Sequence, residues 1–136
     1  MKVVIDTNVL VSALYKPAST PGRIVILALE GAIQLFAPDT VRAELERVLR
    51  VKLRYSDSDW DRTLAALSVS WIEAATYQTH LGKAAGAIRD PDDAPVVAVA
   101  LLLKAVVVSG DAAFHLLRKP VVKTLRPREM TTKGAG

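Results

Sequence analysis

The chain of 136 residues contains no cysteine. This absence excludes disulfide bonds, cysteine-based zinc sites and cysteine nucleophiles. Histidine is scarce as well, because His80 and His115 are the only two, and no metal-binding spacing links them. Any metal site predicted from this sequence must therefore be built from oxygen ligands.

The chain also lacks a long apolar run, and its first residues lead us to expect no N-terminal targeting segment. The longest apolar stretch, Ala94 to Leu103, is stopped by Lys104 and is too short to span a bilayer. Met1 and Lys2 lead directly into a predicted strand, with no signal peptide. These absences predict a soluble, cytoplasmic protein.

What the chain does contain is enough for one ordinary domain with a buried core. Hydrophobic residues make up 51% of it, and 18 Lys and Arg residues outnumber 14 Asp and Glu residues. The resulting net charge of +4 mildly favours a polyanionic partner, although an excess of basic residues is common. We expect a single domain over residues 1–130 and a disordered tail over residues 131–136.

Short β-branched segments alternate with helical patterns along the chain. Strands are predicted at residues 2–5, 33–37, 72–75, 105–109 and 121–124, with a further short strand near 87–88. Helices are predicted at residues 8–14, 20–31, 39–53, 56–71, 94–104 and 111–117. This alternation predicts an α/β fold, specifically a three-layer α/β/α sandwich with a central, mostly parallel sheet.

Two acidic residues directly follow predicted strands. Asp6 comes after the segment VVI, and Asp111 comes after AVVVSG. Ligands of open parallel sheets bind outside the carboxyl ends of the strands, so both acids are expected at the functional edge. Each acid also has a simpler explanation, because each stands where it could cap the helix that follows.

A third acid lies in the predicted helix 39–53. The apolar stripe of this helix consists of Val41, Leu45, Val48 and Leu49. Glu44 borders this stripe, whereas Glu46 has Arg42 and Arg50 one turn away on either side. We expect Glu44 to be drawn toward the interior and Glu46 to lie on the solvated face. The alternative is that Glu44 merely lies at the edge of the core.

The segment RDPDDAPVVAVALLLKA, residues 89–105, places three acids before an almost wholly apolar helix. Asp93 stands at or near the N-cap of this helix, but capping explains one acid better than three. Asp90 and Asp92 are also compatible with loop charges, and we expect Asp92 to face solvent.

Acids from strand ends, a helix edge and a helix start can converge on one site. Two carboxylates about 4 Å apart repel by roughly 4 kcal/mol at an effective dielectric constant near 20. Such a cluster must take up protons or bind cations, and oxygen ligands select Mg²⁺ or Mn²⁺. In a basic protein, this site suits phosphodiester chemistry.

Four segments carry a resemblance to a known family: VVIDTNVLVSAL, PDTVRAELERVL, RDPDDAPVVAVAL and VVVSGDAAF. In this order and at this spacing they resemble the PIN domain, in particular the VapC-like toxins of bacterial and archaeal toxin–antitoxin modules. The ending LRPREM is similar to the closing segment of one subgroup. The resemblance covers roughly residues 2–130. It implies a Mg²⁺- or Mn²⁺-dependent ribonuclease that forms a homodimer and is controlled by a proteic antitoxin.

The resemblance also implies roles for individual residues. The four acids of the family match Asp6, Glu44, Asp93 and Asp111, as catalytic residues and metal ligands. Thr7, Asn8 and Ser109 match polar positions beside them, and Asp90 is added as a supporting residue without a certain counterpart. The implied reaction is hydrolysis by activated water that attacks the phosphorus in line and leaves a 3′-hydroxyl and a 5′-phosphate.

Basic residues outside the acid cluster are candidates for binding the RNA backbone. They lie along or just past the predicted helix 39–53 and comprise Arg42, Arg47, Arg50, Lys52 and Arg54. For most of these residues we expect the simpler explanation, an ordinary charged helix face in solvent, to be the correct one. Aromatic residues make up only 5% of the chain, so base stacking is not expected to drive binding.

Two other functions remain open at this point. The first is a non-catalytic PIN-fold module that binds RNA or another partner. The second is a phosphatase of the haloacid-dehalogenase type with Asp6 as nucleophile, which usually needs a second aspartate where this chain has Asn8.

The predicted helix 56–71 offers a possible partner surface. Trp60, Leu64, Leu67 and Trp71 recur in it at helical spacing. If part of this stripe is exposed, it suits a dimer or antitoxin contact. The alternative is that the stripe only packs on the core.

Overall fold

The structure is a computed structural model that describes residues 1–135, with side chains described as far as Thr131. In chain order, its elements are β1 (Lys2–Ile5), α1 (Thr7–Tyr15), α2 (Thr20–Leu29), β2 (Gln34–Pro38), α3 (Asp39–Val51), α4 (Asp57–Ala66), β3 (Val69–Ile72), α5 (Ala74–Tyr77), the 3₁₀ helix η1 (Gln78–His80), α6 (Leu81–Ala87), the 3₁₀ helix η2 (Pro91–Asp93), α7 (Ala94–Leu103), β4 (Val106–Val108), α8 (Ala112–His115), β5 (Thr124–Leu125) and α9 (Pro127–Ala135).

The strands form one parallel sheet in the order β3-β2-β1-β4-β5. Strand β1 is central: Val4 pairs with Phe36 of β2 on one side and with Val107 of β4 on the other. Its residues Val3 and Ile5 are fully buried, as expected for a strand covered on both faces. The predicted α/β fold with a parallel central sheet is confirmed.

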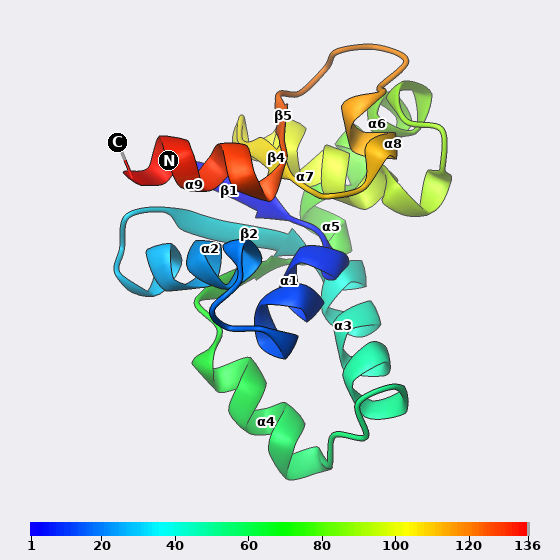
Figure 1. The fold of residues 1–136 in the computed structure, drawn as a ribbon. Coiled ribbons are helices and arrows are strands. Elements are labelled where there is room, and N and C mark those ends of the chain that lie inside the picture. The colour runs from blue at the N-terminus through cyan, green and yellow to red at the C-terminus, as the bar shows by residue number, and fades with distance from the viewer. Residues whose placement is uncertain (136) are drawn as a thin grey trace.

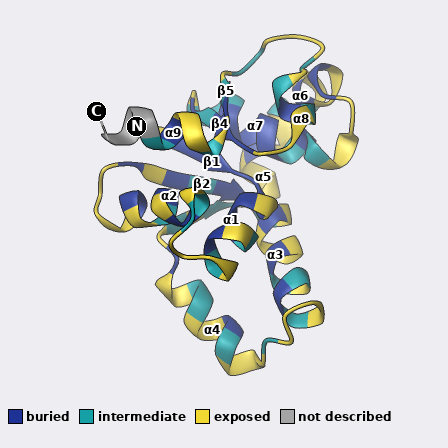
Figure 2. Cartoon of the chain, in the orientation of Figure 1, coloured by how far each residue is buried: buried dark blue, intermediate teal, exposed yellow. Residues whose placement is uncertain are grey.

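Helices cover the two faces of this sheet (Figure 1). On one face α7 contacts β1, β2 and β4, and α5 and α6 pack against α7. On the other face α1 packs against α2, which in turn packs against α9. Helices α3 and α4 project away from the sheet as a pair, and their surfaces are largely exposed or half-buried (Figure 2). The apolar helix α7 is buried along most of its length, as its sequence predicts.

The strand order creates a crevice at one edge of the sheet. From β1 the chain moves outward to β2 and β3, and it then returns to the other side of β1 to form β4. Ligand sites of open parallel sheets lie at such a reversal, outside the carboxyl ends of the strands. Here these are the ends of β1 and β4, which are followed by Asp6 and by residues 109–111.

The predicted helix 56–71 is wrong in its second half. Helix α4 ends at Ala66, Leu67 adopts an extended conformation, and strand β3 begins at Val69. Val69 pairs with Leu35, and Trp71 pairs with Ala37. Strand β3 pairs with the otherwise open edge of β2, and this pairing is favoured over continuation of the helix. The β-branched and aromatic residues of β3 also favour a strand.

The apolar stripe predicted for that helix consequently does not exist as a single face. Trp60 and Leu67 are buried in the core, and Trp71 lies in the sheet, half-buried. Leu64 of α4 packs partly against the same core. The alternative in which these residues only pack on the core is the one that the structure supports.

Several other boundaries differ from the prediction. Residues 87–88 end helix α6 rather than forming a strand, and β5 lies at Thr124–Leu125 rather than at 121–124. Ser19 caps α2, because its hydroxyl oxygen accepts a hydrogen bond from the amide of Gly22. The exact residues at these boundaries depend on the caps and on the pairing of strands.

Residues 131–136 were expected to form a disordered tail, but residues 131–135 belong to helix α9. Helix α9 begins with Pro127 in its first turn, and the carboxylate of Glu129 accepts a hydrogen bond from the amide of Arg126. Met130 is fully buried and anchors the helix, which continues to Ala135. Gly136 lies outside the described residues.

Among the helices that the structure describes, none is both long enough and apolar enough to cross a membrane.

Candidate functional site

A small cleft of about 70 Å³ opens at the carboxyl ends of β1 and β4. It is lined by residues of α1, α3, η2, α7 and the loop after β4: Asp6, Thr7, Asn8, Thr40, Val41, Glu44, Asp92, Asp93, Val96 and Asp111. All four acids predicted as site residues therefore line one cleft, although they are spread over more than one hundred positions of the chain.

Asp6 is the most deeply placed of these acids, with a residue exposure of 6%. Its Oδ1 accepts a hydrogen bond from the amide of Val9, 3.2 Å away, and thereby caps α1. Its Oδ2 accepts a hydrogen bond from the Ser109 hydroxyl. Burial raises the pKa of Asp6 above its ordinary value, the two hydrogen bonds counteract this rise, and the charges of Asp111 and Glu44 add to it. Asp6 therefore caps α1 and also lines the cleft.

Ser109 joins the ends of the two central strands. Its side chain is completely buried, it donates to Asp6, and its Oγ accepts a hydrogen bond from the amide of Asp111 at 2.9 Å. Asp111 is exposed and uses its Oδ1 to accept a hydrogen bond from the amide of Ala113, 2.9 Å away, which caps α8. Asp111 therefore also combines a cap with a place in the lining of the cleft.

Asp93 is half-buried and is the N-cap residue of α7, as predicted, but its side chain forms no capping hydrogen bond. The residue belongs to the short η2, and the turn into α7 is set by the backbone and by Pro95. Burial is the main reason that the pKa of Asp93 rises to about 6, and repulsion by Asp90, Asp111, Asp6 and Glu44 adds to the rise. This carboxylate has no cationic partner among the described residues that line the cleft.

The neighbouring acids of this segment have different positions. The Oδ1 of Asp90 accepts a hydrogen bond from the amide of Asp92 at 3.0 Å, so Asp90 caps η2 from outside the cleft. Asp92 is exposed, as expected, but it also lines the cleft. Its contribution to the site was missed because a loop residue shows no helical or strand phase in the sequence.

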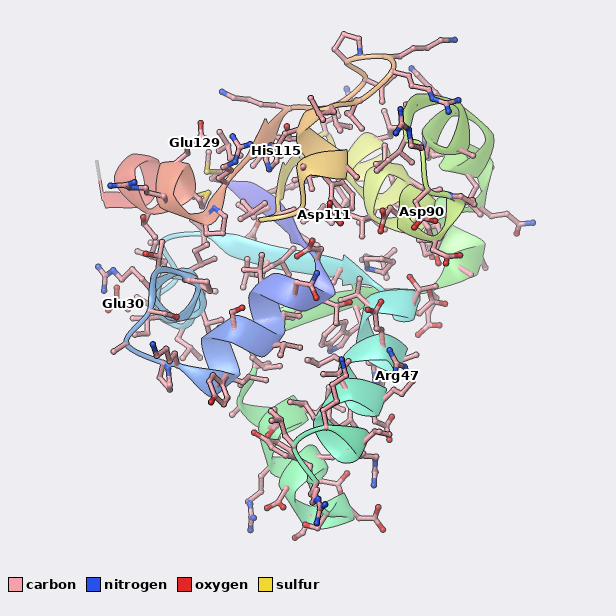
Figure 3. The ribbon with its side chains drawn as sticks, turned by 45° about the vertical axis from the view of Figure 1, so that its right-hand side comes forward. Glu30, Arg47, Asp90, Asp111, His115 and Glu129 are labelled. Atoms are coloured by element: carbon pink, nitrogen blue, oxygen red, sulfur yellow. The ribbon has the colours of Figure 1, made fainter. Side chains whose placement is uncertain are left out.

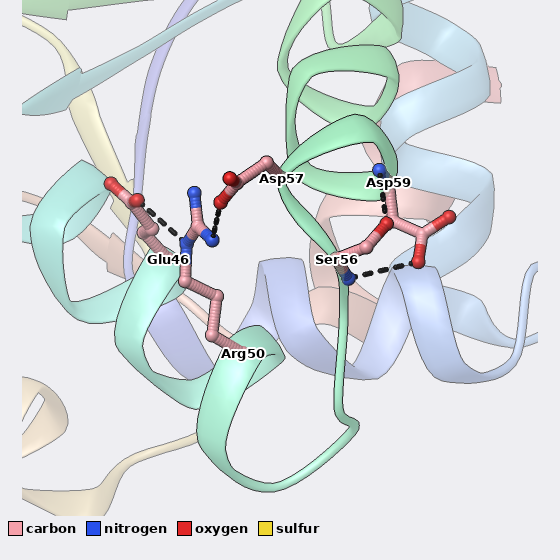
Figure 4. A network of polar contacts seen from close by, with 5 residues as sticks. All are labelled: Glu46, Arg50, Ser56, Asp57 and Asp59. Carbon is pink, nitrogen blue, oxygen red and sulfur yellow. Dashed lines mark hydrogen bonds and ion pairs between the residues drawn. The ribbon is translucent and has the colours of Figure 1, made fainter.

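Glu44 is exposed rather than drawn into the interior, so that expectation is wrong. The buried stripe of α3 consists of Val41, Leu45 and Leu49, and Glu44 stands beside it on the flank that borders the cleft. Glu46 forms an ion pair with Arg50 at 2.8 Å, and Arg50 also contacts Asp57 at the start of α4 (Figure 4). Glu44 forms no ion pair with another described residue and stands at the rim of the cleft.

Two contacts that the sequence did not suggest support the elements of the site. The His115 ring places Nε2 2.8 Å from the carbonyl oxygen of Ser109 and Nδ1 3.2 Å from Oγ1 of Thr124. His115 thereby holds the loop that carries Ser109 against β5. Its partners come from distant parts of the sheet, and no motif spacing could have indicated them.

The second such contact fixes the start of α3. The hydroxyl of the buried Tyr77 donates a hydrogen bond to Oδ1 of Asp39 at 2.5 Å, and Oδ2 of Asp39 accepts one from the amide of Ala74 at 3.1 Å. Burial and the adjacent Asp39 carboxylate raise the pKa of Tyr77 well above its ordinary value. These bonds hold α5 against the helix turn that carries Thr40 and Glu44.

The basic residues predicted to bind RNA separate into three groups. Arg47 lines a hollow of about 490 Å³ that shares Thr40, Glu44 and Asp92 with the cleft, and Figure 3 shows Arg47 on α3 below Asp111. Arg50 is held by Glu46 and Asp57. Arg42, Lys52 and Arg54 are exposed, the last two beyond the end of α3.

The chemistry of the cleft fits a hard divalent cation in part. Its charged donors are carboxylates, the type of ligand that Mg²⁺ and Mn²⁺ prefer. The pKa values of Asp6 and Asp93 are raised mainly by burial and further by the neighbouring negative charges. The spacing is less complete, because no three His, Asp or Glu side chains in the described part of the chain lie close enough to hold an ion.

Comparison with known proteins agrees with this arrangement. The family model of the PIN domain matches residues 2–113. An uncharacterized protein of Methanocaldococcus jannaschii, MJ1680, is 32% identical over 119 residues, which cover 87% of this chain and 76% of that protein.

Solved structures share the fold at low sequence identity. A chain of VapBC2 from Rickettsia felis, bound to a DNA fragment from the promoter, superposes with a TM-score of 0.63 at 19% identity over 93% of this chain and 98% of its own. A chain of VapBC-1 from nontypeable Haemophilus influenzae gives 0.61 at 15% identity, over 94% and 99%. A chain of a toxin–antitoxin complex from Klebsiella pneumoniae gives 0.62 at 18%, over 92% and 97%. The family match, the relative and the shared fold together show that this chain belongs to the PIN domain family.

Proposed function

We propose that this chain is a divalent-metal-dependent endoribonuclease, and that it acts in the cytoplasm as the toxin of a toxin–antitoxin pair. The observation that carries the proposal is the lining of the cleft, in which Asp6, Glu44, Asp93 and Asp111 meet without a Lys, Arg or His among the described lining residues. In a basic protein, a cleft lined by carboxylates suits a divalent cation and a phosphodiester bound to it.

Each acid has a role in this proposal. Asp6, Asp93 and Asp111 would hold Mg²⁺ or Mn²⁺, and Glu44 would complete the site from the rim of α3. The bound ion would supply activation of water and neutralisation of phosphate charge. Because no three of the described acids stand at ligand spacing, they would have to approach one another on binding. The charge of the bound cation would offset the burial and the repulsion that raise the pKa of Asp93.

The polar neighbours of the acids would position them and the substrate. Ser109 and the amide of Val9 hold both oxygens of Asp6, so this carboxylate is oriented before a ligand arrives. The same two bonds make Asp6 a poor candidate for the free nucleophile of a phosphatase. Thr7 and Asn8, also in the lining, offer a hydroxyl and an amide to a bound phosphate or its ribose.

A cleavage assay tests the proposed activity directly. Purified protein with Mg²⁺ or Mn²⁺ should cleave single-stranded RNA to products with 5′-phosphates, and a chelator should stop the reaction. Asp6→Asn should lose most of the activity. Equal cleavage by the wild type and this variant would show that the cleft is not the active site.

The second candidate function is a non-catalytic RNA-binding module of the PIN fold. The missing ligand spacing among the described acids is the observation that favours it. Such a module would bind RNA without cleaving it in any divalent ion, and its melting temperature would not respond to Mg²⁺ or Mn²⁺. The nuclease requires the opposite result in both measurements.

The toxin role and its partners are proposed from the family resemblance and from neighbours that are described as VapBC and toxin–antitoxin complexes. We expect a homodimer and a proteic antitoxin. Tyr15 and Leu29, 70% and 59% exposed on α1 and α2, provide apolar surface for such contacts.

Two experiments test these partners and the toxin role. Sedimentation should show a dimer, and a clean monomer of 14.7 kDa would contradict it. Expression should arrest growth with the wild type but not with Asp6→Asn, and equal growth of both would contradict the toxin role.

A further inference from the structure

We propose that Arg89 and Arg118 form a phosphate subsite that binds the RNA backbone beside the bond cleaved in the acid-lined cleft. This inference rests on the proposed function and adds to it a site that lies outside the predicted basic helix. It assigns part of the binding of substrate to the segment around α8 rather than to α3.

The two arginines line one hollow of about 300 Å³ together with Ala112, Ala113 and Leu116. They come from segments that are far apart in sequence, because Arg89 follows α6 and Arg118 follows α8. The amide of Arg118 donates a hydrogen bond to the carbonyl oxygen of Ala87 at 2.8 Å, which ties these segments together. Helices α6 and α8 accordingly lie side by side in Figure 1. The backbone thus places two guanidinium groups around one space.

Both guanidinium groups are available to a ligand. Arg89 and Arg118 are exposed, and neither side chain forms an ion pair or hydrogen bond with another residue in the described part of the chain. Arg50 and Arg62, in contrast, are occupied by carboxylates of α3 and α4. Two unpaired like charges that share a hollow are complementary to an anion, and guanidinium groups can bind a phosphate in a bidentate manner.

The hollow borders the candidate active site through its own residues. Arg89 directly precedes Asp90, and Ala112 directly follows Asp111, which lines the acid cleft. Figure 3 shows Asp90 and Asp111 on the same side of the molecule, near α7 and α8. A strand whose phosphate lies at Asp111 would therefore continue past α8 toward the two arginines.

Electrostatics explains why such a subsite is needed. The cleft is lined by Asp6, Glu44, Asp92, Asp93 and Asp111, and this concentration of negative charge repels a polyanion. Cations outside the cleft must hold the neighbouring phosphates while the acids keep their places for metal. Arg47 can do so on the α3 side, and Arg89 with Arg118 on the α8 side.

The apolar part of the hollow favours a nucleotide over a free ion. Leu116 is 76% exposed and lies beside the methyl groups of Ala112 and Ala113. A ribose or base can rest on this floor while the arginines bind the phosphate attached to it. An acidic protein segment is the competing occupant, but it would have no reason to continue into a cleft of carboxylates.

Binding of a fluorescein-labelled single-stranded oligouridylate, followed by anisotropy with Mg²⁺ present, tests the subsite. All proteins carry Asp6→Asn to hold back cleavage. The added pair Arg89→Gln and Arg118→Gln should weaken binding roughly tenfold, the effect of losing one set of charge-assisted hydrogen bonds. The slope of log K against log salt should fall by about 0.7, the value for one phosphate contact on a single strand.

The matched control is Lys83→Gln with Lys119→Gln, which removes the same charge from the same two segments without touching the lining. We expect it to change affinity by less than about twofold, because screening weakens distant exposed charges. The affinity of the pair Arg89→Lys and Arg118→Lys for RNA should lie between those of the parent and the Arg→Gln pair. Lysine keeps the positive charge but lacks the planar guanidinium group that binds a phosphate in a bidentate manner.

Three results would overturn the proposal. If the Arg→Gln pair bound RNA as well as the parent, the two arginines would not form a subsite. If the control pair Lys83→Gln with Lys119→Gln lost as much affinity as the Arg→Gln pair, the effect would come from general positive charge and not from this hollow. Unchanged RNA binding, together with a polyglutamate peptide that binds the parent but not the Arg→Gln pair, would make the hollow a protein site. If the parent bound no RNA at all, the proposed function would fail as well, which separates that outcome from the others.

Discussion

The hydroxyl of Ser109 donates a hydrogen bond to the carboxylate of Asp6 across 103 positions of the chain. This bond joins the ends of the two central strands, β1 and β4, inside the protein. It also connects the most buried acid of the cleft to Asp111, whose amide donates to the same Ser109 oxygen. A single buried hydroxyl therefore links two of the acids proposed to bind metal.

Replacing this hydroxyl should lower both stability and activity. Ser109→Ala leaves the amide of Asp111 without its partner and removes a donor from Asp6, so we expect a loss of roughly 1–3 kcal/mol in the free energy of unfolding. Urea unfolding measures this loss, and RNA cleavage should fall with it because Asp6 is no longer held. Ser109→Thr retains the hydroxyl, and better stability and cleavage than in Ser109→Ala are expected of it. If Ser109→Ala were as stable as the wild type, the bond would contribute nothing.

Divalent metal should stabilise the folded protein. Mg²⁺ or Mn²⁺ that binds only the folded state raises the melting temperature in proportion to the logarithm of its concentration once the site is saturated. The pair Asp6→Asn and Asp93→Asn should abolish this increase, because it removes two of the proposed ligands. Thermal unfolding with and without metal measures the effect, and an undiminished increase in the double variant would place the metal elsewhere.

The two glutamates of α3 should differ in their effect on catalysis. Glu44→Gln removes charge from the rim of the cleft and should reduce RNA cleavage sharply. Glu46→Gln removes an ion pair with Arg50 outside the cleft lining and should cost only about 0.5 kcal/mol of stability or less, with cleavage retained. Parallel cleavage assays and urea unfolding of both variants separate these effects. Similar losses of cleavage would contradict the placement of Glu44 alone at the site.

Without metal, the acid cleft should make the protein more stable at mildly acidic pH. The pKa of Asp93 is raised from 3.8 to about 6, and that of Asp6 is raised as well, so between these values the folded state binds more protons than the unfolded state. Their stabilising contribution is complete below the unfolded value and is lost as pH rises through the folded value.

This dependence can be measured as the difference between wild type and Asp93→Asn. As pH falls from about 7 toward 5, the melting temperature of the metal-free wild type should rise relative to that of the variant. Saturating Mg²⁺ should reduce the trend, because the ion takes the place of the proton. If the difference in melting temperature did not change with pH, folding would not raise the pKa of Asp93.

The sequence by itself determined the class of fold and the identity of the acids. The β-branched run before Asp6 and the one before Ser109 could only be buried strands, and the helical patterns between strands required a parallel sheet. Since parallel strands end at the same edge, the positions of Asp6 and Asp111 just after two such strands are enough to place them together. Periodicity did not predict the burial of the two glutamates of α3, because Glu44 is exposed and Glu46 is half-buried, although Glu44 is the one that lines the cleft.

Only the tertiary structure decided the features that depend on distant partners. Residues 67–71 leave the helix because the edge of β2 accepts a strand there, and the strand preference of Val69 and Trp71 alone does not decide between helix and strand. Asp92 joins the cleft because η2 turns it inward, and His115 supports Ser109 because β5 returns beside β4. Arg89 and Arg118 share a hollow through one backbone hydrogen bond to Ala87. Local sequence patterns report which face of an element is apolar, whereas the meeting of polar groups from separate elements is set by packing and by long-range hydrogen bonds.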